Sequence, residues 1–238
     1  MTGTALQFRN LVKRYDKKPV LQGVDLDVAQ GEFVGLAGVN GAGKTTLIKC
    51  LLDFHRVDEG TIEIFGVDHR QTRARQALAF LPERFTPPYY LTGLDFLKYA
   101  LELQAVPYDA DEANAMLDAL DLNKSALTRP IRSYSKGMTQ KLGLATCFLA
   151  KKAMYVLDEP MSGLDPKARA LLKAMLLQLR ASGRTLFFSS HALADVQEIC
   201  DRMAILHEGR LRFVGTPAAC KEQFGCDTLE QAFLRCIA

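Results

Sequence analysis

The chain has 238 residues, of which 48% are hydrophobic and 24% are charged, and its formal net charge is +3. This composition excludes a chain that is disordered over most of its length. A nucleic-acid-binding protein usually has a denser basic surface, so nucleic acid is not an expected partner. The longest apolar run, residues 142–150, is too short to span a membrane, and the N-terminal residues do not resemble a secretory signal. We therefore expect a cytoplasmic protein that reaches a membrane only through a partner.

The N-terminal part of the chain is predicted to consist mainly of strands. Residues 6–15 mix apolar and polar side chains, and Val24–Val28 alternates strictly, as in a half-buried strand. Phe33–Ala37 is a short apolar run, which is typical of a buried parallel strand. A Gly-rich loop and a helical pattern from Thr46 to about Asp53 follow, and then a short strand over residues 61–65.

The middle of the chain, residues 84–150, has a different character. It contains several prolines and helical spacings of apolar residues, and no clear strand pattern. After it, predicted strands and helices alternate, which favours an α/β fold whose mostly parallel sheet is covered on both faces. We expect a core of residues 1–83 and 151–238 with an inserted helical subdomain over 84–150. The C-terminal elements are predicted strands at 153–160, 185–190 and 203–208, and helices at 166–181, 192–200 and 229–237.

The strongest chemical signal is the segment GVNGAGKTT, residues 38–46. It matches G-x-x-x-x-G-K-[ST] and lies between an apolar strand and a helix, where this pattern forms a phosphate-binding loop. The glycines allow backbone N–H groups to face the phosphates, and the helix N-terminus adds partial positive charge. Lys44 supplies a full charge, and the Thr45 hydroxyl can bind Mg²⁺. The candidate nucleotide-binding residues of this loop are Asn40, Gly41, Ala42, Gly43, Lys44, Thr45 and Thr46.

Two further segments add candidate groups. YVLDEP, residues 155–160, is an apolar strand that ends in two acids, so Asp158 and Glu159 are expected at the ligand-binding edge of the sheet. Asp158 can belong to a Mg²⁺ shell, and Glu159 can polarise a water for attack on a phosphate. In SYSKGM, residues 133–138, Ser135 and Gly137 begin a helix at a position that can bind an anion, although an ordinary helix cap explains this segment better when it is taken alone.

The order and spacing of these segments resemble the nucleotide-binding subunit of an ATP-binding-cassette (ABC) transporter over essentially the whole chain. Residues 38–46 resemble the family's Walker A motif, residues 155–160 its Walker B motif and residues 133–138 its signature motif. SGLDP, residues 162–166, resembles the D-loop, and the segment that begins at residue 189 resembles the H-loop region. Five motifs in this order make the resemblance specific.

The resemblance implies a P-loop NTPase core with a mostly parallel sheet, an N-terminal antiparallel β subdomain and an inserted helical subdomain. It implies ATP and Mg²⁺ as ligands and catalytic roles for Glu159 and His191. Tyr15 is expected to stack on the adenine, and Ser135 and Gly137 are expected to close on ATP held by a second subunit. The implied Mg²⁺ ligands are Thr45, Glu83 and Asp158.

The resemblance also implies a membrane partner. In the family, the region that corresponds to residues 87–94 meets the permease, and Tyr89 and Tyr90 suit such a contact. Packing of these two tyrosines within the helical subdomain is an equal alternative. A permease would hold the subunit at the inner face of the cell membrane.

The sequence departs from the family pattern at three places, of which Val39, where the Walker A motif commonly has Pro, has no consequence for the chemistry. The signature reads Tyr-Ser-Lys-Gly-Met where Leu-Ser-Gly-Gly-Gln is usual, but Ser135 and Gly137 are retained. Glu83 stands where the family usually has Gln, so it places an extra negative charge beside the phosphates.

We expect an ATPase subunit that drives transport, in the export direction, through a separate permease. The alternative is an ABC ATPase that acts on the ribosome or DNA without a permease. Such proteins usually carry two cassettes or long inserts, and this chain has neither. A nucleotide-gated binding module without turnover is disfavoured by the presence of Glu159 and His191.

Overall fold

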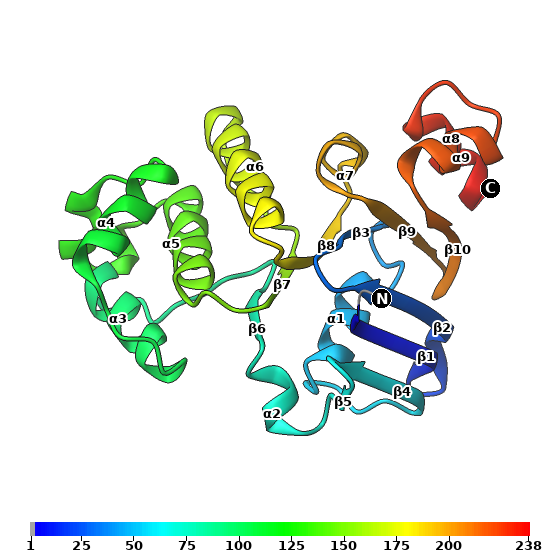
Figure 1. The fold of residues 1–238 in the computed structure, drawn as a ribbon, viewed down its shortest axis with the longest axis horizontal. Coiled ribbons are helices and arrows are strands. Elements are labelled where there is room, and N and C mark those ends of the chain that lie inside the picture. The colour runs from blue at the N-terminus through cyan, green and yellow to red at the C-terminus, as the bar shows by residue number, and fades with distance from the viewer. Residues whose placement is uncertain (1–2) are drawn as a thin grey trace.

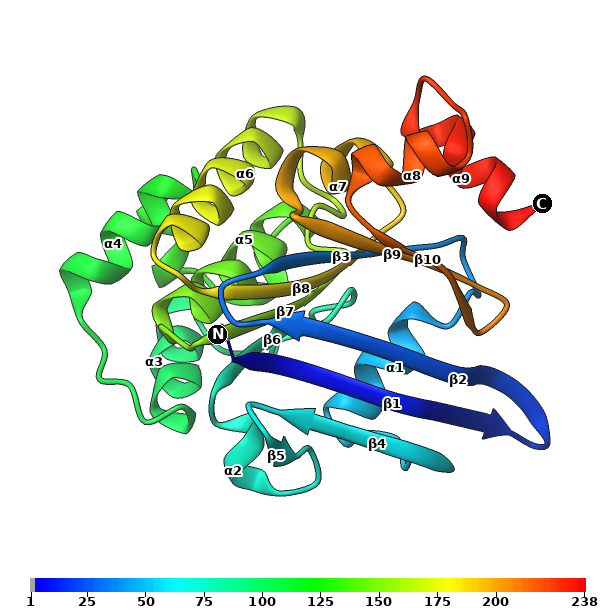
Figure 2. The same cartoon turned by 45° about the vertical axis from the view of Figure 1, so that its right-hand side comes forward.

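Two β-sheets organise the fold in the computed structural model, which describes residues 3–238 (Figures 1 and 2). Within these residues, one sheet has four antiparallel strands and the other has six strands, which pair in parallel except at β10. In spatial order, the first sheet is β2 (Lys18–Ala29), β1 (Thr4–Tyr15), β4 (Glu59–Ile64) and β5 (Val67–Asp68). The second sheet is β10 (Arg210–Gly215), β9 (Arg202–His207), β3 (Phe33–Ala37), β8 (Thr185–Ser190), β7 (Met154–Asp158) and β6 (Leu78–Leu81).

Helices cover both faces of the six-stranded sheet. On one face, α1 (Lys44–Leu51) is sandwiched against the antiparallel sheet in a shared apolar core. On the other face lie α5 (Lys136–Leu149), α6 (Pro166–Ala181), α7 (Leu193–Ile199) and α9 (Leu229–Ile237) (Figure 2). Alternate residues of one strand serve the two cores, since Val156 packs with α1 while Tyr155 packs with α5. Burial on both faces explains why these strands read as continuous apolar runs.

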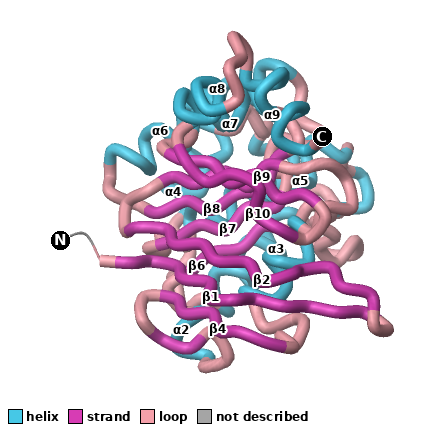
Figure 3. Tube along the Cα trace, turned by 90° about the vertical axis from the view of Figure 1, so that its right-hand side faces the viewer, coloured by secondary structure: helices cyan, strands magenta, loops and turns pink. Residues whose placement is uncertain are grey.

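The chain between β6 and β7 is helical. It contains α3 (Gly93–Leu103), α4 (Ala110–Ala119), two short 3₁₀ helices and α5, and its only strand-like contact is one bridge between Thr92 and Pro130. Figure 1 shows α3, α4 and α5 gathered at one end of the molecule, with the antiparallel sheet toward the other end. The tube in Figure 3 shows the strands of both sheets stacked in the middle, with α8 (Pro217–Gln223) and α9 beyond them.

Several elements were not predicted from the sequence. The strands β5, β6 and β10 and the helices α2 (Thr72–Arg75) and α8 are all short, and a short element gives little periodicity to read. Among these elements, β10 has a strand pattern in its sequence that was overlooked, because Leu211 and Phe213 alternate with exposed arginines. The helix α1 begins at Lys44, two residues before its expected start, because its N-cap is Gly43. Within residues 3–238, no helix combines the length and the apolarity that a membrane span requires.

Candidate functional site

The Gly-rich loop connects β3 to α1 and brings its backbone close to neighbouring segments. Gly43 caps the helix with a φ of 110°, a conformation that side chains other than glycine rarely adopt. A Cβ atom at Gly43 would lie 3.0 Å from the Val20 carbonyl oxygen, and one at Gly38 would lie 2.5 Å from the Leu206 carbonyl oxygen. The spacing of the two glycines therefore reflects backbone geometry and close packing, which position Lys44 at the start of the helix.

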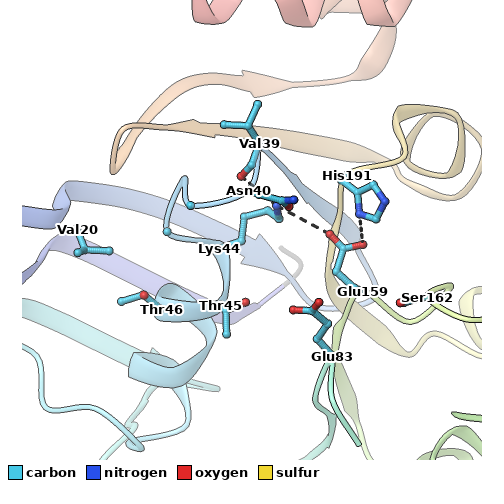
Figure 4. A pocket seen from close by; sticks show the side chains of 12 residues that line it. Val20, Val39, Asn40, Lys44, Thr45, Thr46, Glu83, Glu159, Ser162 and His191 are labelled. Atoms are coloured by element: carbon cyan, nitrogen blue, oxygen red, sulfur yellow. Dashed lines mark hydrogen bonds and ion pairs between the residues drawn. The ribbon is translucent and has the colours of Figure 1, made fainter. Parts of the chain in front are cut away.

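A cavity of about 400 Å³ opens beside this loop, where β3, β7 and β8 end. Figure 4 shows Lys44, Glu159, His191 and Glu83 around it, contributed by segments that are far apart in the sequence. Six of the seven predicted loop residues line the cavity, whereas Ala42 is buried in the core beside it. The complete lining is Val20, Val39, Asn40, Gly41, Gly43, Lys44, Thr45, Thr46, Glu83, Glu159, Ser162 and His191.

Lys44 is held inside the loop. Its Nζ donates hydrogen bonds to the carbonyl oxygens of Gly38 at 2.7 Å and Val39 at 3.3 Å, and it lies 3.9 Å from Glu159 Oε1. Burial lowers the pKa of Lys44, while the negative charges of Glu159, Asp158 and Glu83 act in the opposite direction. The loop thus holds an incompletely compensated ammonium group at the edge of a cavity, which is an arrangement that favours a polyanionic ligand.

Ser189 connects the two acids at the end of β7. Its hydroxyl donates to Asp158 Oδ1 at 2.5 Å and accepts from the backbone N–H of Glu159 at 3.0 Å. Ser189 is fully buried, so water does not compete for the hydrogen bond between its hydroxyl and Asp158. The sequence analysis gave Ser189 no role, although this residue ends the apolar strand β8 and begins the segment that resembles the H-loop region.

Glu159 and His191 are in direct contact at the wall of the cavity. The Nδ1 atom of His191 lies 2.8 Å from Glu159 Oε2, and this pair is marked in Figure 4. The side chain of Glu159 is 10% exposed, whereas that of His191 is 67% exposed. A buried carboxylate that touches a solvent-accessible imidazole can orient a water and move a proton to the surface.

Oxygen-bearing side chains near Lys44 form a site that suits a divalent cation. Thr45, Asp158 and Glu83 line a second cavity of about 430 Å³ that adjoins the first. Burial raises the pKa of Asp158, and hydrogen bonds from Ser189 and Thr45 offset this only in part, so a positive charge beside this carboxylate would be stabilised. Hydroxyl and carboxylate oxygens are ligands that Mg²⁺ prefers, and Mg²⁺ commonly takes only one or two from the protein and the rest from phosphates and water.

Some predicted residues lie outside this cavity. Tyr15 is at the end of β1, where it packs edge-on against His55 with ring centroids 5.6 Å apart, and Val20 lines the cavity instead. Ser135 caps α5 by accepting a hydrogen bond from Met138 N–H at 3.2 Å, and Gly137 is two residues further on. The cavity and the Ser135 helix terminus are thus separate features of one chain.

The buried charge of Asp158 leads to a stability prediction. Because its pKa is raised in the folded state, the folded protein holds this proton more tightly, and stability falls as the pH rises above about 3.9, the ordinary aspartate pKa. Asp158→Asn is therefore expected to increase the free energy of unfolding at pH 7, and the gain should shrink as the pH is lowered toward 4. Urea unfolding without nucleotide or metal measures this. A variant less stable than wild type at pH 7 would mean that the hydrogen bond from Ser189 to the ionised Asp158 carboxylate stabilises the protein by more than the burial of that charge costs.

Comparison with known proteins identifies the family. The family model described as ABC transporter matches residues 21–162. An uncharacterised ABC transporter ATP-binding protein of Nostoc is 42% identical over 197 residues, which cover 80% of this chain and 58% of that protein. The Nod factor export ATP-binding protein I of Burkholderia orbicola is 35% identical over 97% of this chain and 77% of its own length.

A solved structure agrees with these sequence matches. An ATP-binding subunit of an ABC transporter superposes with a TM-score of 0.89 at 30% identity, and the match covers 98% of this chain and 99% of that one. The expected α/β fold, with its mostly parallel sheet and antiparallel N-terminal sheet, is thereby confirmed. The chain spans little more than half the length of the Nostoc relative. Since the family model matches more than half of the chain and the relatives match along most of it, this chain belongs to the ABC transporter family.

Proposed function

We propose that this chain is an ATP-binding and ATP-hydrolysing subunit that drives transport through a separate permease. The observation that carries the proposal is the convergence of Lys44, Glu159 and His191 on one cavity beside a phosphate-binding loop. We further propose that residues 1–238 form one ABC ATPase domain with a helical subdomain over 84–150. The run of helices between β6 and β7 supports that division.

Each polar group of the cavity has a distinct proposed task. The loop N–H groups and Lys44 bind the phosphates, and Glu159 orients and deprotonates the attacking water. His191, which contacts Glu159 at 2.8 Å, binds the terminal phosphate and supports the charge that develops on it. Mg²⁺, held by Thr45 and Asp158 with Glu83 beside them, would neutralise phosphate charge. Tyr15 and Val20 provide the surface for the adenine.

A second copy of the chain completes the site in this proposal. The start of α5, with Ser135 and Gly137, offers N–H groups and a helix dipole to ATP held by the other copy. The exposure of Ser135 and its separation from the P-loop cavity of its own chain support an action between subunits. ATP that touches both copies only in the closed dimer stabilises that dimer, because its affinity for the two states differs.

Transport is favoured over an action on the ribosome or DNA by the names of the relatives, two of which are an ABC transporter ATP-binding protein and an export ATP-binding protein. The second name also supports export as the direction. The purified chain should hydrolyse ATP with Mg²⁺, and affinity capture from detergent-solubilised membranes should recover a multi-span protein. Stimulation of hydrolysis by ribosomes or DNA, with no membrane protein recovered, would favour the alternative.

The permease is proposed to bind at Tyr89 and Tyr90, which would hold the subunit at the inner face of the cell membrane. The side chains are not packed inside the helical region, since Tyr89 is 67% and Tyr90 is 70% exposed. Their rings contact each other in a T-shaped arrangement at 5.7 Å and form a small aromatic surface. Exposed aromatic residues of this kind are common at the centre of protein interfaces.

Charge at this surface is expected to disrupt the complex. Tyr90→Glu should weaken capture of the permease by roughly tenfold or more, because a central interface tyrosine often contributes about 2 kcal/mol. ATP hydrolysis by the isolated subunit should be unaffected. Tyr99→Glu, which changes another exposed tyrosine of the helical region, is the matched control. Loss of hydrolysis by Tyr90→Glu would argue against this surface. So would equal capture of the permease by wild type, Tyr90→Glu and Tyr99→Glu.

A further inference from the structure

The turn that follows Glu159 is tied to the first two turns of α5. The Gln140 side-chain amide donates to the Pro160 carbonyl oxygen at 3.1 Å, and Lys136 Nζ donates to Ser162 Oγ at 3.3 Å. Lys136 and Gln140 are four residues apart on α5, so their side chains leave the same face of the helix. The helix and the turn are therefore connected at two points.

Glu159 itself has a backbone conformation that needs such support. Its φ is +50°, in the left-handed region, which costs a residue with a side chain on the order of 1 kcal/mol or more. Its N–H is fixed by Ser189, and its carbonyl oxygen accepts from Ser162 N–H at 3.0 Å. Conformations of this kind persist where surrounding contacts leave no alternative.

The contact between α5 and the turn is close and partly buried. Gln140 is only 5% exposed, so the bond from its amide to Pro160 is shielded from water. A Cβ atom at Gly163 would lie 2.9 Å from Lys136 Cε, and one at Gly137 would lie 3.2 Å from the Gly163 carbonyl oxygen. A shift of α5 relative to the turn would thus strain the segment that begins with Glu159.

We propose that Gln140 is a positioning residue for Glu159. Its hydrogen bond to Pro160 fixes the turn in which Glu159 sits and so sets where the carboxylate points. Through this bond, α5, which begins at Ser135, is mechanically connected to the water-activating group of its own chain. The inference rests on the proposed catalytic role of Glu159.

Gln140→Met tests the inference, because methionine has nearly the same length and lacks the amide donor. We expect kcat for ATP hydrolysis to fall by roughly 10- to 100-fold, as for misplaced catalytic groups, while KM for ATP changes less than about twofold. Gln140→Glu, which places an acceptor against the carbonyl oxygen, should behave in the same way. Thermal unfolding and titration with a fluorescent ATP analogue establish that each variant is folded and binds nucleotide.

Lys141→Met is the matched control. Lys141 is the next residue of α5 and is 8% exposed, and its Nζ donates a hydrogen bond at 2.8 Å to the Asp121 carbonyl oxygen and lies 3.6 Å from the Asp121 carboxylate. The Lys141→Met substitution removes a buried hydrogen bond of the same helix and leaves the bond to Pro160 in place. The kcat of this variant should therefore stay within about threefold of wild type. If Lys141→Met and Gln140→Met lower kcat equally, the effect belongs to α5 as a whole and the inference is wrong.

A double-mutant cycle separates positioning from general damage. If Gln140 acts through Glu159, Gln140→Met should cause no further loss of the residual hydrolysis in a Glu159→Ala background. An equal proportional loss in both backgrounds would overturn the inference. A wild-type rate in Gln140→Met, with Glu159→Ala strongly slowed, would overturn this inference alone. A wild-type chain that does not hydrolyse ATP, or is indifferent to Glu159→Ala, would instead refute the proposed function.

Discussion

Glu159→Gln is expected to reduce ATP hydrolysis by about 10²- to 10⁴-fold, which is the usual contribution of a general base, while ATP still binds. The amide keeps the size of the side chain and an acceptor for His191, whose Nδ1 lies 2.8 Å from Glu159 Oε2. It cannot accept the proton of the attacking water. Since the ATP that holds two copies together is no longer consumed, the variant should accumulate as an ATP-bound dimer.

Size-exclusion chromatography with light scattering, with and without ATP and Mg²⁺, measures this outcome. Glu102→Gln, a neutralised carboxylate on the exposed side of α3, is the control and should hydrolyse ATP like wild type. A Glu159→Gln variant that hydrolyses ATP at the wild-type rate would remove Glu159 from catalysis. One that binds ATP and remains monomeric would contradict the shared site.

Lys44→Ala is expected to have the second large effect, on nucleotide affinity. Lys44 is 8% exposed and its ammonium is held by loop carbonyl oxygens at the cavity edge. Removing one partner of a buried charge pair costs about 2–5 kcal/mol, so ATP affinity should fall by roughly 30- to 5,000-fold. Hydrolysis at fixed ATP should fall at least as much.

Titration of each protein with a fluorescent ATP analogue gives the affinity change. Lys98→Ala makes the same substitution at an exposed lysine of α3 that lines neither cavity, and should bind ATP within about threefold of wild type. Equal affinities of Lys44→Ala and wild type would contradict the assignment of the phosphate-binding loop.

Much of the site could be predicted because its chemistry is local in the sequence. The P-loop pattern lies in nine consecutive residues, and Asp158 and Glu159 directly follow an apolar strand. Parallel strands end at one sheet edge, so the order of strands and acids was enough to expect Lys44 and Glu159 together. The structure adds the distance of 3.9 Å between Lys44 Nζ and Glu159 Oε1, which no spacing in the sequence could provide.

The groups that support the site could not be predicted in this way. Ser189 and Gln140 act on residues 30 and 20 positions away through hydrogen bonds that depend on how β8 and α5 pack beside β7. Ser189 begins the segment that resembles the H-loop region, and Gln140 lies two residues after the segment that resembles the signature, but neither resemblance indicates these hydrogen bonds. The short edge strand β6 was missed for a related reason, since its four residues are a strand only because β7 pairs with them.

Mixing two inactive variants is the most direct test of the central claim, that a site in one copy is completed by α5 of another. Lys44→Ala has a defective P-loop and an intact α5 terminus, and Ser135→Arg has the reverse. When they are mixed, half of the dimers should be mixed and should hold one intact site, so up to about a quarter of the wild-type rate should return. A mixture as inactive as its components would show that each site is built within a single chain, which would contradict the account.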